Sequence, residues 1–218
     1  MFKLFLTAYG YDVYIAEDGE KGLELFKQIA PDIIFTDIKM PGMDGLEVLS
    51  RIKQTKIASQ VIIITGHGDM ERALEALDLT ASDFINKPVE RQALNAALAR
   101  AEKRIALPCD FPAEFTITTR NAVLIISIKG KLTAGAEPYF LSQISPKSLK
   151  DIQEVQLVMD DSFSIDRRGI ALLMQVLQTL KQQHISIVME NLTCNYARIF
   201  KMAGMEKMAT LNETPAED

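Results

Sequence analysis

Apolar and polar positions follow two different periods along the first half of the chain. Short continuous apolar runs predict buried parallel strands, and segments with apolar residues three or four positions apart predict amphipathic helices. The predicted strands span residues 12–16, 33–36, 61–64 and 84–86. The predicted helices span residues 21–29, 45–54, 70–79 and 90–104, after a short helix that stops at Gly10. Strands that alternate with helices indicate βαβ crossovers around a parallel sheet.

The pattern changes near residue 106, where Pro108 and Pro112 interrupt the helical period. We therefore predict two α/β domains, residues 1–105 and 114–211, joined by a linker at 106–113 and followed by a disordered polar tail at 212–218. The second domain is predicted to contain strands at 115–119, 123–129, 155–159 and 185–189 and a helix at 168–183. Its first two strands should form a hairpin with a tight turn at Arg120 and Asn121.

Composition limits the kind of protein that this chain can be. With 218 residues, of which 48% are hydrophobic, the chain can bury two small cores. A formal net charge of −5 argues against nucleic-acid binding. The chain has no apolar run of membrane-spanning length, no secretory signal and no paired cysteines, so we expect a cytoplasmic protein without a membrane partner. His67 and His184 are too few and too far apart to suggest a metal site or a catalytic triad.

Three polar residues with complementary chemistry each follow a predicted strand. They are Asp37, Thr65 and Lys87, and in a parallel sheet these strand ends share one edge. A carboxylate can attack a phosphoryl group there, an ammonium can offset the charge on its oxygens, and a hydroxyl can donate a hydrogen bond to it. Each residue alone has a simpler interpretation, since an aspartate at a strand end is commonly a helix cap or turn former.

Together with their surroundings, these residues resemble the receiver domain of bacterial response regulators. The resemblance rests on D-I-K-M-P-G-M-D-G from Asp37, I-T-G-H-G-D from Ile64 and D-F-I-N-K-P from Asp83, and it covers residues 1–104. It implies a flavodoxin-like, doubly wound parallel sheet and a place in two-component signal transduction. It also implies that Asp37 accepts a phosphoryl group from a sensor histidine kinase, and that Thr65 and Lys87 contact that group.

The resemblance assigns expectations to three further positions. Phe84 matches an aromatic residue that swings inward when the threonine closes on the phosphoryl group, although a plain core phenylalanine is the simpler interpretation. Pro88 matches a proline that follows a cis peptide bond. Thr80 stands where the family usually has a glycine with a left-handed backbone at the end of the fourth helix, so that turn should be strained or differently built.

The start of the chain departs from the receiver pattern. Family receivers begin with an apolar strand that ends in two acidic residues that bind Mg²⁺, and neither the strand nor the acidic pair is present here. Asp37 and the backbone carbonyl of Lys39 are the metal ligands that remain. In the family sheet order 2-1-3-4-5 the absent strand is central, and burial of its side chains is worth roughly 5 to 10 kcal/mol. We therefore expect a fragile domain, and a longer natural product with about 15 to 20 additional residues before Met1.

The second domain resembles, more weakly, the STAS domain of anti-sigma factor antagonists. The motifs are I-K-G-K-L-T from Ile128, V-M-D-D-S from Val158, I-D-R-R-G-I from Ile165 and A-R-I-F-K-M-A-G-M-E-K-M from Ala197. In that family an Asp-Ser-Ser-Gly turn carries the serine that a partner kinase phosphorylates. The matching positions here are Asp166, Arg167, Arg168 and Gly169, so the phosphoacceptor serine is absent. Asp166 can still cap a helix, and the two arginines are either a solvated surface or a docking surface for an acidic or phosphorylated partner.

These observations predict a response regulator that is not an enzyme. Asp37 would accept the phosphoryl group and the STAS-like module would signal to a protein partner, such as an anti-sigma factor or a related kinase. The alternative is a scaffold with a receiver-like fold that binds partners without phosphorylation. A third interpretation, in which Asp37 is the nucleophile of a phosphatase, would be supported by turnover of a phosphoester.

We expect this chain to react poorly with a small phosphodonor such as acetyl phosphate. Mg²⁺ neutralises charge between an attacking carboxylate and an anionic phosphoryl group, and the acidic pair that holds it is missing. A variant extended upstream by the missing strand should incorporate the label at a higher rate. Strong magnesium-dependent labelling of this chain would contradict the prediction.

Overall fold

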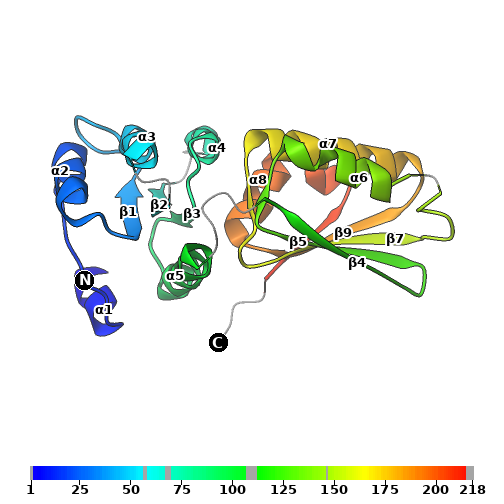
Figure 1. The fold of residues 1–218 in the computed structure, drawn as a ribbon, viewed down its shortest axis with the longest axis horizontal. Helices are drawn as coiled ribbons and strands as arrows, with labels where there is room; N and C mark the ends of the chain where they lie inside the picture. Colours follow the sequence, from blue (N-terminus) through cyan, green and yellow to red (C-terminus); the bar gives the residue numbers. More distant parts are fainter. Residues whose placement is uncertain (1, 56–57, 67–69, 107–111, 146, 215–218) are drawn as a thin grey trace. The chain divides into compact units, whose positions relative to one another are not determined.

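A computed structural model describes residues 2–55, 58–66, 70–106, 112–145 and 147–214. The chain divides into two compact units, Met1–Pro88 and Val89–Asp218, and each is described by itself. Both units combine a mostly parallel sheet with helices (Figure 1), which confirms the α/β fold class for both.

The first unit is built on a three-stranded parallel sheet in the order β1-β2-β3. Its strands are β1 (Ile33–Asp37), β2 (Gln60–Thr65) and β3 (Asp83–Asn86), and its helices are α1 (Phe2–Ala8), α2 (Gly19–Ile29), α3 (Gly45–Thr55) and α4 (Met70–Asp78). These bounds agree with the predicted ranges to within two residues. Helices α2, α3 and α4 lie side by side along one face of the sheet (Figure 1). The central strand β2 is almost completely buried, with Val61, Ile62 and Ile63 inaccessible to solvent, as its continuous apolar run predicts.

The prediction of a strand at residues 12–16 is wrong. Residues 11–16 belong to no strand, and within the described part of the chain β1 pairs only with β2. Tyr14 and Ile15 remain 57% and 65% exposed. A strand needs a neighbour to pair its backbone groups, and β-branched or aromatic residues do not create a ladder without one.

The end of helix α4 has the left-handed residue that the resemblance suggested. Thr80 has φ +63°, and its N–H donates to the Leu77 carbonyl while the Ala81 N–H donates to the Ala76 carbonyl, at 3.0 and 2.8 Å. This pair of hydrogen bonds is a Schellman motif with Thr80 at the position where glycine is favoured. A β-branched residue is strained in this conformation.

The second unit contains a five-stranded sheet in the order β10-β9-β7-β5-β4. Only the β4–β5 pair is antiparallel. The strands are β4 (Glu114–Arg120), β5 (Val123–Lys129), β7 (Glu154–Met159), β9 (Ser186–Leu192) and β10 (Thr210–Glu213). The helices are α5 (Arg91–Ile105), α6 (Glu137–Gln143), α7 (Arg167–Gln182) and α8 (Cys194–Met202). The two-residue strands β6 (Lys131–Leu132) and β8 (Ser164–Ile165) pair with each other, and short 3₁₀ turns cover Ala134–Ala136 and Met205–Lys207.

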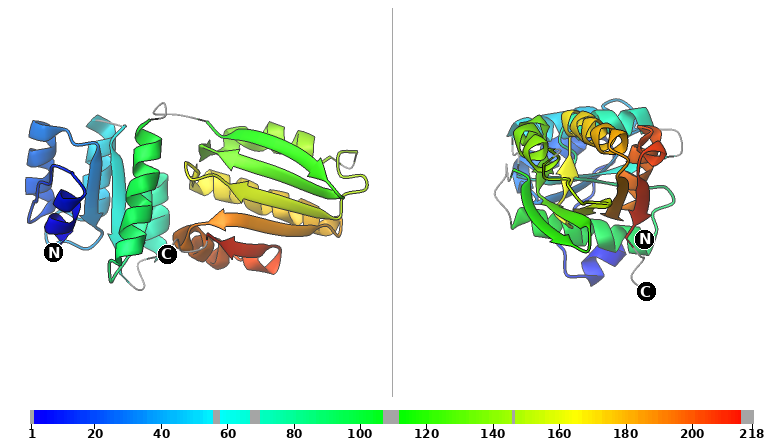
Figure 2. Two further views of the ribbon diagram at one scale, coloured as in Figure 1. Left: turned by 90° about the horizontal axis from the view of Figure 1, so that it is seen from below. Right: turned by 90° about the vertical axis from the view of Figure 1, so that its right-hand side faces the viewer.

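Helices α6, α7 and α8 cover one face of this sheet, whereas the opposite face lies toward the viewer in Figure 2 (left). Burial also differs between the two faces of the sheet. Along β5, the buried residues Leu124, Ile126 and Ile128 alternate with residues that are less buried. The helix α7 stripe that includes Leu173, Val176 and Leu177 is buried, as its helical spacing predicts.

Several details of the second unit differ from the predictions. The hairpin turn lies at Asn121 and Ala122, which have φ of +47° and +63°, one residue later than predicted. The sequence pattern did not identify α6 and α8 as helices. Strand β10 reaches into the segment that was predicted to be a disordered tail, while residues 215–218, Pro108, Cys109 and His67 lie outside the described residues.

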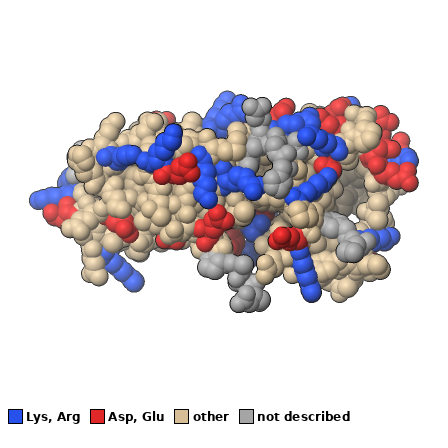
Figure 3. All heavy atoms as spheres, turned by 180° about the vertical axis from the view of Figure 1, so that it is seen from behind, with Lys and Arg blue, Asp and Glu red and all other residues tan. Residues whose placement is uncertain are grey.

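None of the described helices combines the length and the apolar character that crossing a bilayer requires. On the face drawn in Figure 3, acidic and basic side chains are interspersed. His184 is exposed, in the turn that follows α7, which agrees with a surface role.

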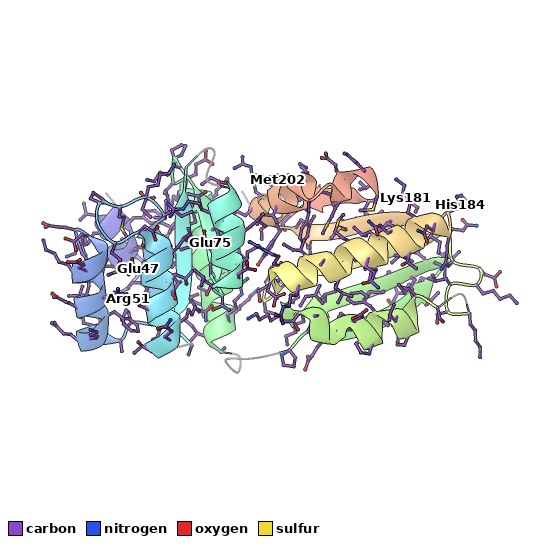
Figure 4. All side chains as sticks on the ribbon, turned by 90° about the horizontal axis from the view of Figure 1, so that it is seen from above. Glu47, Arg51, Glu75, Lys181, His184 and Met202 are labelled. Atoms are coloured by element: carbon purple, nitrogen blue, oxygen red, sulfur yellow. The ribbon has the colours of Figure 1, made fainter. Side chains whose placement is uncertain are left out.

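Replacement of Thr80 by glycine should stabilise the first unit by about 1 kcal/mol. Glycine removes the left-handed strain of about 1 to 2 kcal/mol, and part of this gain is offset by the greater freedom of glycine in the unfolded chain. Urea unfolding measures the difference. Glu75→Gly is the matched control, because Glu75 is exposed on α4 (Figure 4), where glycine should instead destabilise by about 0.5 to 1 kcal/mol. Equal losses in both variants would contradict the assigned strain.

Candidate functional site

The carboxyl ends of the three strands in the first unit meet at one edge of the sheet. Asp37 is the last residue of β1 and is in register with Ile64, while Thr65 is the last residue of β2 and is in register with Asn86. The backbone continues this alignment, because the Ile38 N–H donates to the Ile64 carbonyl at 3.2 Å and the Lys87 N–H donates to the Thr65 carbonyl at 2.8 Å. The structure therefore places Asp37, Thr65 and Lys87 at the same edge.

Asp37 and Lys87 form an ion pair across this edge. The Lys87 ammonium donates to Oδ2 of Asp37, and the backbone N–H of Lys39 donates to Oδ1 at 3.2 Å. The Asp37 side chain is 29% exposed and that of Lys87 is 50% exposed, so the carboxylate is open to solvent on one side. A carboxylate in this position is accessible to a reactant and is held in orientation by two donors.

Thr65 lies beside this pair and bonds to a residue that the sequence analysis did not identify. Thr65 is 5% exposed, and its hydroxyl donates a hydrogen bond to Oδ1 of Asn86 at 3.1 Å. Asn86 lies between Ile85 and Lys87 in the D-F-I-N-K-P motif, which was its only signal in the sequence. To reach a group bound to Asp37, the Thr65 hydroxyl has to exchange this hydrogen bond.

The loop after Asp37 returns very close to β1. The Gly45 N–H donates to the Ile38 carbonyl at 3.0 Å, and a Cβ at Gly45 would lie 2.0 Å from the Asp37 carbonyl oxygen. Any side chain at this position would displace the backbone of the phosphoacceptor candidate. The glycine in M-D-G is therefore required by the close approach of two backbone segments.

Asp44 holds the start of α3 and is a second residue that the sequence analysis missed. Its Oδ1 accepts hydrogen bonds from the N–H groups of Leu46 and Glu47, at 3.0 and 2.9 Å, and its Oδ2 pairs with Arg72 of α4. Burial would raise the pKa of the Asp44 carboxyl, but the Glu47 N–H and the Arg72 guanidinium outweigh it and lower that pKa. Asp44 thus links the loop after Asp37 to the helix after Thr65.

The residues at this edge fit only part of a Mg²⁺ site. Mg²⁺ requires several oxygen ligands, and the Asp37 carboxylate and the Lys39 carbonyl are two candidates. Among the described residues, no three or more His, Cys, Asp or Glu side chains form a group that could hold a metal. The Asp37 carboxylate is also bonded to Lys87. We therefore assign no chemical step to the metal.

Two further positions singled out by the resemblance lie on β3 and directly after it. Phe84 is 3% exposed in β3, an inward position that both a switch residue and a core residue would occupy. The Lys87–Pro88 peptide bond is cis.

In the second unit, Asp166 caps helix α7. Its carboxylate accepts a hydrogen bond from the Gly169 N–H at 2.7 Å, as predicted. A Cβ at Gly169 would lie 2.3 Å from the Leu132 carbonyl oxygen, so the helix start packs tightly against β6. Arg167 and Arg168 are exposed in the first turn of this helix.

The loop before this helix is bound by the end of helix α5. Lys103 pairs with Asp161, and Nη2 of Arg104 donates to the Phe163 carbonyl at 2.7 Å. Ser162 is 4% exposed, and its hydroxyl donates to Oδ1 of Asp160 at 2.6 Å. Burial opposes ionisation of Asp160, but the Ser162 hydrogen bonds and nearby lysine charges lower the pKa of its carboxyl.

Comparison with known proteins identifies both halves of the chain. Residues 1–99 match the model of the response regulator receiver domain, and residues 114–217 match that of the STAS domain. The chain is 36% identical over 92 residues to the regulatory protein AtoC of Escherichia coli, and 35% identical over 96 residues to the transcriptional regulatory protein FixJ of Bradyrhizobium diazoefficiens. A receiver domain protein of Clostridium thermocellum is similar in structure, with 34% identity, a TM-score of 0.46 and coverage of 49% of this chain and 87% of that one.

These similarities are partial in length. The match covers 42% of this chain and 20% of AtoC, and 44% of this chain and 47% of FixJ. The chain therefore spans less than half the length of either relative.

The ion pair between Asp44 and Arg72 should make the free energy of unfolding of the first unit depend on pH in the acid range. Because the folded-state pKa of Asp44 is lowered, its stabilising contribution is complete above the unfolded-state pKa and is lost as the pH falls through the folded-state pKa. Asp44→Asn retains a capping oxygen but removes the charge, so it should be less stable than the natural chain at neutral pH. Urea unfolding as a function of pH should show this difference shrinking in acid, and a difference that does not vary with pH would contradict the charge effect.

Proposed function

Because residues 1–99 belong to the response regulator receiver family and residues 114–217 to the STAS family, we propose that this chain is a phosphorylation-controlled signalling protein. In this proposal Asp37 accepts a phosphoryl group and the STAS module transmits the signal to a protein partner. The observation that carries the proposal is the ion pair between Asp37 and Lys87 at the common edge of the three strands. A carboxylate and an ammonium lie in contact there, which is the pair of groups that phosphoryl transfer requires.

The proposed transfer begins at a phosphorylated histidine of a sensor kinase. An oxygen of the Asp37 carboxylate attacks phosphorus, the bond between phosphorus and the imidazole nitrogen breaks, and the imidazole leaves with the electron pair and takes up a proton. The product is an acyl phosphate on Asp37. The Lys87 ammonium, which is already at Oδ2, offsets the negative charge that gathers on the phosphoryl oxygens.

Thr65 and Phe84 supply the switch in this proposal. Thr65 leaves Asn86 and donates its hydroxyl to a phosphoryl oxygen, so the product state differs from the present state by an exchanged hydrogen bond. Phe84 is buried in β3 two residues before Asn86, in register with Ile63 of β2, so its packing can respond to a change at the strand end. A local exchange of this kind can bias two discrete packings.

The proposed output surface is the start of helix α7. Arg167 and Arg168 are exposed there, and the motif resemblance aligns Arg167 with the phosphoacceptor serine of anti-sigma factor antagonists. Two arginines in a first helical turn suit an acidic or phosphorylated segment of a protein partner. Lys103 and Arg104 of helix α5 contact Asp161 and Phe163 in the loop that precedes α7. These contacts connect helix α5 physically to the output surface.

The second candidate function is a scaffold that binds its partner without phosphorylation. It is favoured by one observation, that the described residues offer only part of a Mg²⁺ site. Receiver domains in general bind Mg²⁺ for phosphorylation, so an incomplete site would slow the transfer. Partner binding that is equal for the natural chain and for Asp37→Ala would support the scaffold.

Phosphoryl label incorporated from acetyl phosphate, although slow, should be located on Asp37. The label should be sensitive to hydroxylamine, since it is an acyl phosphate, and reduction with borohydride followed by mass spectrometry should identify the residue. Asp37→Asn should remove the label, and Lys87→Ala should lower the labelling rate by about tenfold or more, because a charge-stabilising donor is lost.

Lys39→Ala is the matched control for Lys87→Ala, because this substitution removes a neighbouring ammonium but retains the backbone N–H of residue 39 that donates to Asp37. This variant should be labelled at the natural rate. Label that persists in Asp37→Asn would contradict the assignment of the phosphoacceptor, and an equal loss in Lys39→Ala would contradict a specific role for Lys87.

A further inference from the structure

Strand β4 lies at the edge of its sheet, where no other described strand pairs with the backbone groups on its outer side. In the described part of the chain β4 pairs only with β5, in an antiparallel register that joins Glu114 to Lys129 and Arg120 to Val123 without a bulge. It is the edge strand of the five-stranded sheet (Figure 1). Natural edges are usually blocked by proline, lysine or a bulge, and β4 has none of these between its ends.

The hydrogen bonds of β5 reveal which groups of β4 point outward. The Ile128 carbonyl accepts from the Asp160 N–H at 2.9 Å, so Ile128 turns its backbone toward β7 and away from its β4 partner, Phe115. Bonding alternates along an antiparallel ladder. The N–H and carbonyl groups of Phe115, Ile117 and Thr119 therefore point away from β5, toward the outer edge.

We infer that this edge binds a second copy of the chain, with the two β4 strands antiparallel about a two-fold axis at Ile117. This register places Ile117 opposite Ile117 and Phe115 opposite Thr119, so every outward group meets an outward group of the other copy. The two sheets then continue into one. The four consecutive β-branched residues from Thr116 to Thr119 favour such an extended pairing.

Charge complementarity favours a second copy over an unrelated peptide. In the same register Glu114 of each copy lies opposite Arg120 of the other, at both ends of the paired strands. Both residues are exposed, and neither side chain has a hydrogen bond or ion pair among the described contacts. Opposite charges directly across a strand pair stabilise it, whereas like charges oppose it. Strand β4 is therefore complementary to itself in charge as well as in backbone bonding.

Charge reversal tests this pairing on the full chain. Sedimentation velocity over a micromolar concentration range should detect a dimer for the natural chain. Glu114→Arg or Arg120→Glu should each weaken dimerisation by about tenfold, because both end pairs change from attraction to repulsion. The double variant Glu114→Arg with Arg120→Glu restores opposite charges in the same register and should restore the dimer. Glu206→Arg, at an exposed site outside the sheet, is the control and should leave the dimer unchanged.

A second measurement does not depend on charge. Residue-resolved hydrogen exchange should slow with rising concentration at the amides of Phe115, Ile117 and Thr119, while those of Thr116 and Thr118, which already bond to β5, should not change. Thermal unfolding of each variant shows whether it is folded. A chain that stays monomeric, a dimer unaffected by either single reversal, or a double variant without recovery would each overturn the inference.

Discussion

The parallel pairing of β1, β2 and β3 is the constraint on which the rest of the first unit depends. Strands that run in the same direction bring their carboxyl ends to one edge, and the residues that follow them become neighbours. Asp37 and Lys87 are 50 residues apart in the chain and form an ion pair there. The loop that leaves this edge must pass the backbone of Asp37 so closely that only glycine fits at position 45.

Both units place their candidate chemistry where a strand gives way to a helix. In each of them an aspartate caps the helix, with Asp44 at α3 and Asp166 at α7. In each a glycine in the first turn lies against a backbone carbonyl, which brings the helix start close to the sheet. The chemistry of the two sites differs because a carboxylate and an ammonium lie beside the first helix start, whereas two exposed arginines lie on the second.

Most elements could be predicted because their signals are local. The continuous apolar run of β2 and the apolar stripe of α7 are each sufficient to predict a buried element. The predicted bounds differ from those of the structure by only one or two residues. The segment 12–16 has the same kind of local signal but forms no strand, because strand formation depends on a neighbour. Helices α6 and α8 are short, with few turns over which a period can be recognised.

The order of residues was enough to identify the candidate set of Asp37, Thr65 and Lys87, because each of these residues directly follows a predicted strand. It was also enough to suggest the family of each unit. The hydrogen-bond or ion-pair partner of each group became visible only in the folded chain. The Thr65 hydroxyl bonds to Asn86, Asp44 pairs with Arg72, and the outward groups of β4 pair with no other strand among the described residues. The physical reason is that periodicity and turn chemistry act over a few residues, whereas hydrogen-bond partners depend on the register between segments that are far apart in the chain.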